Sequence, residues 1–326
     1  MSKRGKVTIS QVAQAAGVNR SSVSRAFTKP FMLTPETVER IKSAAASLGY
    51  VPNHTARALS TGKNSNLALI VPDVANPFFP PMISAAQDAA DQQDYCVFLG
   101  NSNEDPGKED RLVGRLIGQV EGLILASSRL PEQRILDYAA QRPIVLINRD
   151  VAGVPRVLID SSSGMTEAVQ FLADRGHRKL AYVSGPSGSW SNKSRRTAVR
   201  KAAQKEGLDL YVCPAQVSSF EAGLAVVDRI LDADATVAIA FDDVTAHGIL
   251  VGLEHRGVRV PEDFSIVGCD DVLGELTKPP LTSISNRSAE AGDLAVSLMY
   301  DTLRSSGLKD ARYLLQTELV VRQTTT

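Results

Sequence analysis

The chain has 326 residues, of which 43% are hydrophobic and 22% charged, the composition of an ordinary globular protein. No apolar run approaches the roughly 20 residues that cross a bilayer, and the N-terminus has charge but no apolar segment, so neither a membrane protein nor a secreted one is expected. Three widely spaced cysteines, Cys96, Cys213 and Cys269, form no CxxC motif. We therefore expect reduced thiols, packed as small apolar residues, and a cytoplasmic location.

The net charge of zero conceals two oppositely charged parts. Residues 1–63 hold ten Lys or Arg and two acids, a net charge of +8, so the remainder carries −8. A compact basic segment on an acidic body is typical of nucleic-acid binding. The charge distribution therefore favours a DNA partner for the N-terminal part of the chain.

Residues 7–27 predict two short helices joined by a glycine turn. The first follows Thr8 and ends at Gly17, and the second begins after Asn19, a suitable N-cap. This arrangement is typical of a helix-turn-helix, whose second helix lies in the major groove of DNA. Arginines read guanine edges there and short hydroxyls reach phosphates. The candidate DNA-binding residues of this segment are Thr8, Arg20, Ser21, Ser22, Ser24 and Arg25.

A third helix, capped by Thr34 and ended by Gly49, is expected to close a three-helix DNA-binding domain over residues 1–50. Residues 51–64 predict a hinge helix and linker, with Asn53 as the cap of a helix too short to be stable alone. Arg57 and Leu59 lie on this helix, and Leu59 is a candidate wedge between base steps in the minor groove. The alternative is a plain interdomain linker.

The rest of the chain, residues 65–326, alternates buried strands with helices, which predicts doubly wound parallel sheets. About 260 residues exceed one such sheet, so we expect two α/β lobes that form an effector-binding and dimerisation domain. Lobe one should hold about 65–160 and 288–316, and lobe two about 161–287 and 317–326. Single elements include a helix over 192–206, a helix over 219–232 and a last strand near 313–321. Ligands bind at the carboxyl ends of such strands, so the cleft between the lobes is the expected site.

Aromatic, arginine and carboxylate side chains follow several of these strands. Carboxylates and arginines can clamp hydroxyls, and aromatic faces stack on a sugar ring or a base. The second carboxylate of each pair, Asp243 and Asp271, is more typical of a helix cap or first-turn charge. The candidate effector-binding residues are Asp73, Phe78, Phe79, Arg149, Trp190, Arg196, Asp242 and Asp270.

No catalytic, metal or cofactor site is expected. Two carboxylates across a cleft are the machinery of a glycosidase, but the Asp pairs here are neighbours in sequence. The four histidines fit no metal-ligand spacing, and no GxSxG, GxxxxGK[ST] or HExxH motif is present. We therefore predict a binding protein rather than an enzyme.

Three segments resemble the lactose/galactose-repressor family of bacterial transcription regulators: VTISQVAQAAGV, SSVSR and YVPNHTARALSTGK. The resemblance covers essentially the whole chain. It implies a helix-turn-helix head on a core like that of periplasmic binding proteins. It also implies that Arg20 and Ser21 carry operator specificity, that Arg25 contacts a base, and that Asn53 caps the hinge helix. In addition, it places Leu59 opposite its dimer mate at the kinked operator centre and implies that Phe79, Arg149, Arg196, Asp242 and Asp270 line the effector pocket.

The function predicted is that of a sequence-specific transcription regulator, with repression as the expected outcome. A homodimer would bind a pseudo-palindromic operator and respond to a small sugar or nucleoside. Arg149 and Arg196 leave a sugar phosphate open as an alternative, although Asp242 and Asp270 in the same cleft argue against it. No leucine heptad follows the last strand, so a coiled-coil tetramer is not expected. The alternative is a transport-type sugar-binding protein, which shares the two-lobed fold but does not explain residues 1–63.

Overall fold

A computed structural model describes residues 7–50, 65–304 and 310–326. Contacts divide the chain into two compact units, residues 1–64 and residues 65–326, which we describe separately and call the head and the core. The predicted hinge residues Asn53, Arg57 and Leu59 lie outside the described residues.

The head contains α1 (Ile9–Ala15), α2 (Arg20–Thr28), a 3-10 turn η1 (Pro30–Met32) and α3 (Pro35–Leu48). The predicted caps are present: the Asn19 Oδ1 accepts the Ser22 N–H at 2.7 Å, and Thr34 caps α3. Gly49 ends α3 with φ 68, a left-handed conformation that favours glycine. The spacing of Val38, Ile41, Ala45 and Leu48 predicts one buried face of α3, but Leu48, the last residue of the helix, is 39% exposed. Small apolar residues fill the core of the head: Val12, Ala13, Ala16, Val23, Ala26, Ile41 and Ala45.

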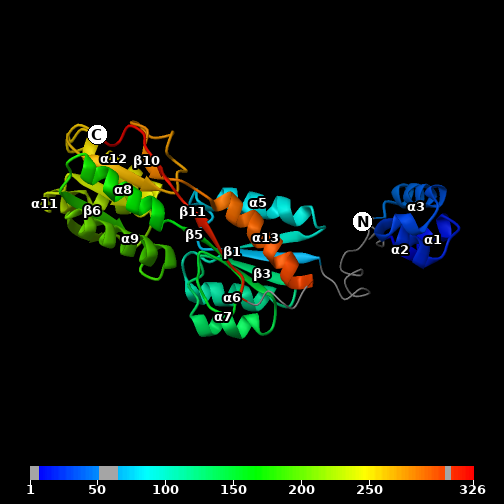
Figure 1. Ribbon diagram of the computed structural model, residues 1–326. Helices are drawn as coiled ribbons and strands as arrows, with labels where there is room; N and C mark the ends of the chain where they lie inside the picture. The colour runs from blue at the N-terminus through cyan, green and yellow to red at the C-terminus, as the bar shows by residue number, and fades with distance from the viewer. Residues whose placement is uncertain (1–6, 51–64, 305–309) are drawn as a thin grey trace, which may run out of the picture. The chain divides into compact units, whose positions relative to one another are not determined.

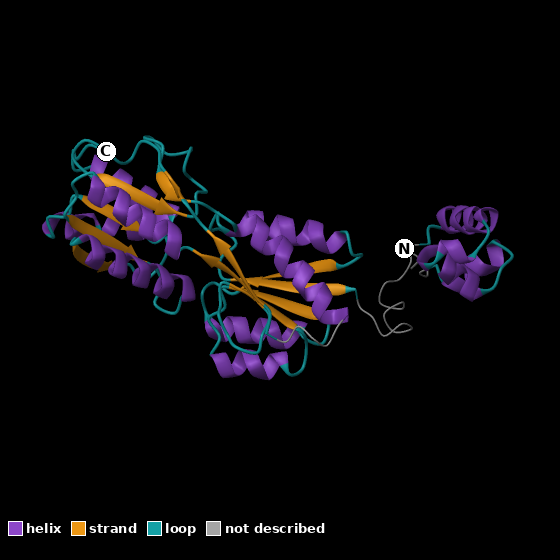
Figure 2. Cartoon of the chain, viewed as in Figure 1, coloured by secondary structure: helices purple, strands orange, loops and turns teal. Residues whose placement is uncertain are grey.

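Lobe one of the core is built on a six-stranded sheet whose neighbouring strands are all parallel, in the order β2–β1–β3–β4–β5–β11 (Figures 1 and 2). Successive residues of a strand face opposite sides of a sheet. Leu67 and Leu69 therefore pack under α5 and α13, whereas Ala68 and Ile70 pack under α6 and α7. The strands are β1 (Asn66–Val71), β2 (Cys96–Asn101), β3 (Gly122–Ala126), β4 (Ile144–Ile147), β5 (Arg156–Asp160) and β11 (Arg312–Gln316). The helices are α5 (Phe79–Asp91), α6 (Pro106–Leu116), α7 (Glu132–Ala139) and α13 (Ser288–Arg304).

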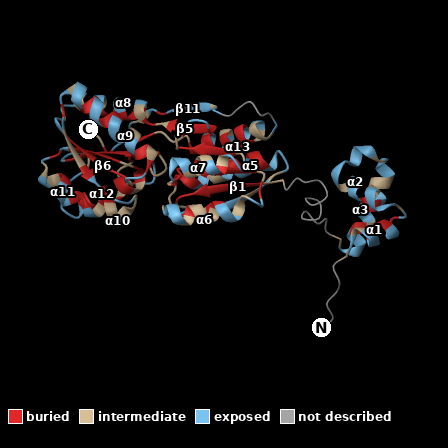
Figure 3. Cartoon of the chain, turned by 90° about the horizontal axis from the view of Figure 1, so that it is seen from below, coloured by how far each residue is buried: buried red, intermediate tan, exposed pale blue. Residues whose placement is uncertain are grey.

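Lobe two repeats the arrangement in the order β7–β6–β8–β9–β10–β12, with β12 antiparallel at the edge. Helices α8 and α9 cover one face, and α10, α11 and α12 cover the other, so the central strands are buried on both sides (Figure 3). The strands are β6 (Lys179–Ser184), β7 (Asp209–Pro214), β8 (Val237–Ala240), β9 (Ser265–Cys269), β10 (Thr282–Ile284) and β12 (Leu319–Val320). The helices are α8 (Ser162–Asp174), α9 (Trp190–Glu206), α10 (Phe220–Ala225), α11 (Val227–Asp232) and α12 (Asp243–Glu254).

These two sheets, with the head, confirm the predicted fold class of a helix-turn-helix unit and a two-lobed doubly wound core. Two single-element predictions need correction. The helix predicted over 219–232 is interrupted at Val226, and the strand predicted near 313–321 is two strands in different sheets. The predicted strand is divided into β11 and β12 because the chain passes from lobe one to lobe two at Thr317–Glu318. The prediction that all three cysteines are packed inside is also wrong, because Cys96 on β2 is exposed.

Three chain segments cross between the lobes and are hydrogen-bonded to one another. The Thr317 hydroxyl donates to the Asp160 carbonyl at 3.2 Å, and the Ser163 hydroxyl donates to the Thr317 carbonyl at 2.8 Å. The third crossing is joined to the same place, because the Glu318 N–H donates to the Ser285 hydroxyl at 3.0 Å. The crossings therefore form one compact hinge beside the carboxyl ends of both sheets.

Candidate functional site

The first candidate site is the outer face of α2 in the head. Arg20, Ser21, Ser24 and Arg25 are exposed, and Ser22 is half-buried. Neither arginine forms an ion pair with a described residue. The apolar face of the helix is turned inward instead, as the helical spacing predicts.

Two hydroxyl groups of the predicted DNA-binding face have defined local partners. The Ser21 hydroxyl donates to the Asn19 Oδ1 at 2.7 Å, which leaves its oxygen lone pairs available to accept. Thr8 precedes α1, where its N–H donates to the Gln11 Oε1 at 2.8 Å. Thr8 is exposed, so its side chain is accessible at the N-terminus of α1.

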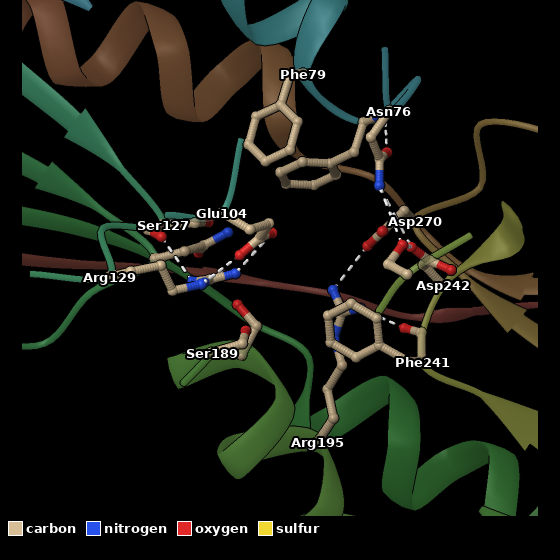
Figure 4. Close-up of a pocket in the computed structure, with 14 residues that line it drawn as sticks. Asn76, Phe79, Glu104, Ser127, Arg129, Ser189, Arg195, Phe241, Asp242 and Asp270 are labelled. Atoms are coloured by element: carbon tan, nitrogen blue, oxygen red, sulfur yellow. Dashed lines mark hydrogen bonds and ion pairs between the residues drawn. The ribbon is translucent and has the colours of Figure 1, made fainter. Parts of the chain in front are cut away.

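The second candidate site is a cavity between the two lobes of the core (Figure 4). Its walls come from the segments that follow the strands of both sheets, the place where open α/β sheets bind ligands. Lobe one contributes Asn76, Phe78, Phe79, Glu104, Ser127, Arg129 and Asn148. Lobe two contributes Ser189, Ser191, Arg195, Ser218, Phe241, Asp242 and Asp270.

Four of these residues adopt a left-handed backbone conformation although none is glycine. The φ angle is 58 at Glu104, 47 at Ser127, 51 at Asn148 and 96 at Asp270. Such conformations are unfavourable for residues with a Cβ and recur at binding sites, where the surrounding fold maintains them. Their clustering at one end of the two sheets marks this cavity as the functional end of the core.

Arg195 is the central cation of lobe two. Its side chain is 4% exposed, and its Nη2 lies 2.7 Å from the Asp270 Oδ1. The Nη1 donates to the Phe241 carbonyl at 2.5 Å, and the guanidinium lies 4.9 Å from the centre of the Phe241 ring. Burial disfavours the charged guanidinium, but attraction to the Asp270 carboxylate outweighs burial and raises the pKa of Arg195. Arg195 is therefore permanently charged and fixed in position.

Arg129 is the corresponding cation of lobe one, and Glu104 holds it by two bonds. The Arg129 Nε lies 2.5 Å from one Glu104 oxygen, and the Nη2 lies 3.0 Å from the other. The Nη1 donates to the Ser127 carbonyl at 2.6 Å. Figure 4 shows this pair on the side of the cavity opposite the Asp270 pair. A planar, two-bond pair of this kind has a defined geometry as well as a favourable energy.

Aromatic rings form the apolar part of the cavity. Phe78 and Phe79 are each 6% exposed and meet edge to face, with ring centres 5.0 Å apart. Phe241 stands across the cavity, beside Arg195 (Figure 4). Rings on two sides and polar groups between them suit a flat ligand that carries hydroxyl groups.

Asn76 and Asp242 connect the two lobes across the cavity. The Asn76 Nδ2 in lobe one donates to the Ser218 hydroxyl at 3.3 Å and to the Asp242 Oδ2 at 3.4 Å, both in lobe two. The Ser218 hydroxyl also donates to the same Asp242 oxygen. The other oxygen of Asp242 accepts the Thr245 N–H at 2.9 Å and caps α12. Asp242 thus belongs both to the cavity and to a helix terminus.

The second carboxylates of the two Asp pairs have structural contacts. Asp243 accepts the Val272 N–H at 2.8 Å and the Leu273 N–H at 2.9 Å, and burial raises its pKa to about 7. Asp271 pairs with Arg322 at 2.6 Å. Asp242 is the cap of α12, and Asp243 lies in the first turn of the same helix, which confirms the first-turn alternative for this residue, while its side chain secures the loop after β9. Asp271 lies in no helix, so the same prediction is wrong for Asp271.

Of the eight predicted effector-binding residues, Phe78, Phe79, Asp242 and Asp270 line the cavity, and the other four do not. Asp73 accepts the Ala75 N–H within its own turn, and Arg149 donates to the Leu130 carbonyl at 3.1 Å. Trp190 faces a separate groove with Asp150 and Lys193, and Arg196 is exposed in another. We correct these placements: the arginine of α9 that enters the cavity is Arg195, because neighbouring residues of a helix point about 100° apart.

The cavity also contains residues that we did not predict. Several belong to segments that follow strands. In the sequence, Asn76 lies two positions before the predicted Phe78, and Arg195 lies one position before the predicted Arg196. Glu104 and Arg129 had no distinguishing signal, because their pairing joins two loops 25 residues apart in sequence. The unpredicted residues are Asn76, Glu104, Ser127, Arg129, Asn148, Ser189, Ser191, Arg195, Ser218 and Phe241.

No group of His, Cys, Asp or Glu within 7–50, 65–304 and 310–326 has the arrangement of a metal site. Across the same ranges, no helix combines the length and the apolar character needed to cross a membrane.

Comparisons with known proteins agree with both units. The model of the bacterial regulatory proteins of the lacI family matches residues 8–53, and a periplasmic binding protein-like domain matches residues 169–325. The transcriptional regulator DegA of Bacillus subtilis (strain 168) is 31% identical over 98% of both chains.

Two solved structures are similar over 98% of this chain and 99% of theirs. One is the lac repressor dimer bound to operator and the anti-inducer ONPF, with 25% identity and a TM-score of 0.88. The other is the complex of the transcriptional regulator CelR with cellobiose, with 30% identity and a TM-score of 0.73. A helix-turn-helix head with a two-lobed core defines a bacterial regulatory protein. The chain belongs to the lacI family of these regulators, as the resemblance of its motifs predicted.

Proposed function

We propose that this protein is a sequence-specific transcription regulator, acting as a repressor, whose operator affinity is controlled by a small sugar-like effector bound between the lobes. The observation that carries the proposal is the presence in one chain of an exposed, arginine-bearing α2 and a buried polar cavity. The proposal is supported by two similar proteins, since the lac repressor dimer binds operator and an anti-inducer, and CelR binds cellobiose.

In the head, α2 is the proposed recognition helix. Its exposed Arg20 and Arg25 are available to guanine edges, because no described residue neutralises them. The hydroxyls of Ser21, Ser22 and Ser24, with that of Thr8, would position the head on phosphates. Asn53, Arg57 and Leu59 stay predictions for the hinge and the operator centre.

In the core, we infer that an effector binds both lobes at once. Its hydroxyl groups would bond to Asp242, Arg195 and Asn76, and its ring would pack on Phe79 or Phe241. A ligand shifts a conformational equilibrium only if it binds one state better than the other. A ligand that touches both walls meets this condition, because lobe closure completes its contacts and moves the chain at the hinge.

The cavity residues support binding rather than catalysis. No His or Cys is among the described residues that line the cavity. Its three carboxylates are already engaged: Glu104 with Arg129, Asp270 with Arg195, and Asp242 with the N-terminus of α12. None is placed as a free general acid or base. We therefore propose a regulator without enzyme activity that acts in the cytoplasm, where its DNA lies.

We further propose that the active form is a homodimer. Strand β2 lies at the edge of its sheet, and its Phe98 and Leu99 are 37% and 46% exposed. An exposed apolar edge strand is a site of association with another chain. A two-fold dimer would present two recognition helices to the two halves of a pseudo-palindromic operator.

The dimer proposal is tested by light scattering during gel filtration of Leu99→Asp. We expect this variant to be a monomer, because a charge in an apolar interface loses water without gaining a partner. The matched control is Leu314→Asp on β11, the opposite edge of the same sheet, where Leu314 is also 46% exposed. A dimeric Leu99→Asp protein, or monomers from both variants, would argue against an interface at β2.

The regulator proposal is tested by selection of duplexes from a random pool with the full-length protein. We expect a palindromic consensus, and we expect one compound from a panel of sugars and nucleosides to change its binding. A palindrome that responds to no compound would leave the DNA-binding part standing and contradict the effector part. Failure to enrich any sequence at low salt would contradict the regulator and favour a transport-type binding protein.

A further inference from the structure

Both arginines that line the cavity are neutralised inside their own lobe. Arg129 and Glu104 belong to lobe one, and Arg195 and Asp270 belong to lobe two. The arginine side chains are 9% and 4% exposed. Because neither pair bridges the lobes, opening or closing of the lobes separates neither pair. The charges of Arg129 and Arg195 therefore stay neutralised whether the lobes are open or closed.

Further bonds fix the orientation of both guanidinium groups, and two of the five N–H groups of each have no partner among the described residues, so they stay available to a neutral acceptor. Arg129 donates to the Ser127 carbonyl, and Arg195 donates to the Phe241 carbonyl and, at 3.3 Å, to the Ser161 hydroxyl. To neutralise either cation itself, an incoming phosphate would have to displace Glu104 from its two-bond pair with Arg129 or Asp270 from Arg195. Breaking the Arg195–Asp270 pair is especially unfavourable, because both side chains are buried and the released charge is left without water or a partner.

The formal charge of the cavity also disfavours an anion. Its charged residues are two arginines and three carboxylates, Glu104, Asp242 and Asp270, which leaves a net charge of −1. Like charges in a buried site repel strongly, because the surrounding protein screens them less than water does. By contrast, hydroxyl groups can donate to the carboxylates and accept from the guanidinium and amide groups without disturbing either pair.

We propose that the cavity selects an uncharged polyhydroxylated effector over phosphorylated or acidic compounds, and that Glu104 is the residue that sets this selectivity. The inference rests on the proposed function, since it names the class of ligand for the same cavity. Glu104 is the deciding residue because its carboxylate binds both the Nε and the Nη2 of Arg129. Without its charge, Arg129 would be a buried cation open to an anion.

Inorganic phosphate is a suitable probe, since it tests the charge of the cavity before any effector is known. Melting temperatures of the full-length protein would be measured in phosphate and in chloride of equal ionic strength. We expect the core of the wild-type protein to gain nothing from phosphate. Glu104→Gln keeps the size of the side chain but removes its charge, and we expect it to bind phosphate about tenfold more tightly or better.

Two further variants test whether the phosphate binds in the cavity rather than elsewhere on the protein. Asp110 forms an ion pair with Arg134 in the same lobe but outside the cavity, and Asp110→Asn removes the charge that neutralises this arginine. It should behave as the wild type, and the basic head is unchanged in all variants. The double variant Glu104→Gln with Arg129→Gln removes the freed cation, so it should lose the phosphate binding that Glu104→Gln gained.

Equal phosphate stabilisation of the wild type and Glu104→Gln would overturn the proposal. A folded Glu104→Gln protein without any gain would overturn it as well. Failure of the proposed function gives a different result, because operator selection would then fail while the phosphate response of the variants still followed Glu104. Operator binding that responds to compounds, together with phosphate binding by the wild-type cavity, would contradict only the charge selectivity.

Discussion

Arginine has opposite environments in the two units of this protein. On α2 of the head, Arg20 and Arg25 are exposed and have no ion pair with a described residue. In the cavity of the core, Arg129 and Arg195 are buried, and each is bound to a carboxylate. An exposed, unneutralised arginine attracts phosphates and reads bases. A buried, neutralised arginine instead offers hydroxyl groups a rigid donor with no excess charge. The head therefore has a surface suited to a polyanion, whereas the core has a cavity suited to a neutral ligand.

The largest effect is expected from Arg195→Ala in the core. This change leaves the Asp270 carboxylate buried without its cation, and we expect a loss of about 3–5 kcal/mol in the free energy of unfolding. Urea denaturation measures this loss, and the effector response should disappear with it. The matched control is Arg196→Ala, one residue along α9 and exposed, which should change stability by no more than about 0.5 kcal/mol. A larger loss of stability from Arg196→Ala than from Arg195→Ala would show that the wrong arginine has been assigned to the cavity.

The next effect concerns the exposed arginines of the head. Arg25→Ala should weaken specific operator binding by about 1–3 kcal/mol, because it removes a base contact and no internal pair. Effector binding should stay unchanged, and fluorescence anisotropy with the selected duplex measures the difference. Arg40→Ala on α3 removes the same exposed charge from another helix and should retain sequence preference. Equal losses from both variants would reduce the role of Arg25 to general electrostatics.

The smallest effect is expected at the contact between the lobes. Asn76→Ala removes the donors to Ser218 and Asp242 without placing a second carboxylate beside Asp242, and it also removes the acceptor for the Phe78 N–H. Because closure becomes less favourable, we expect effector affinity to fall by about 0.5–1.5 kcal/mol. Calorimetric titration measures the change, with Asp73→Asn in the same loop as the control. An unchanged affinity would mean that this contact does not contribute to effector binding.

Much of the head was predictable because its signals are local. The caps Asn19 and Thr34 and the glycine at position 49 each act on residues within a few positions along the chain. The alternation of strands and helices likewise predicted the two parallel sheets, since buried strands have a distinctive apolar pattern. The three-residue strand β10 was missed, because so short a run has no measurable period.

The side chains of the cavity were predicted less well, because their positions depend on contacts between distant segments. Strand ends located the cavity and identified Phe79, Asp242 and Asp270. They could not decide between Arg195 and Arg196, since helical phase is fixed by packing against the sheet. The same holds for Trp190, the single tryptophan of the chain, which lies at the start of α9 and faces a different groove.

The most direct test of this account is the linkage between the two sites. The operator affinity of the full-length protein would be measured with and without saturating effector, and the effector affinity with and without operator. Thermodynamic reciprocity requires one coupling factor in both experiments, and we expect a factor of about 5–150. A factor of one, with both ligands bound, would contradict an effector-controlled regulator. Equal factors well above one would establish that the effector cavity and the basic head are coupled.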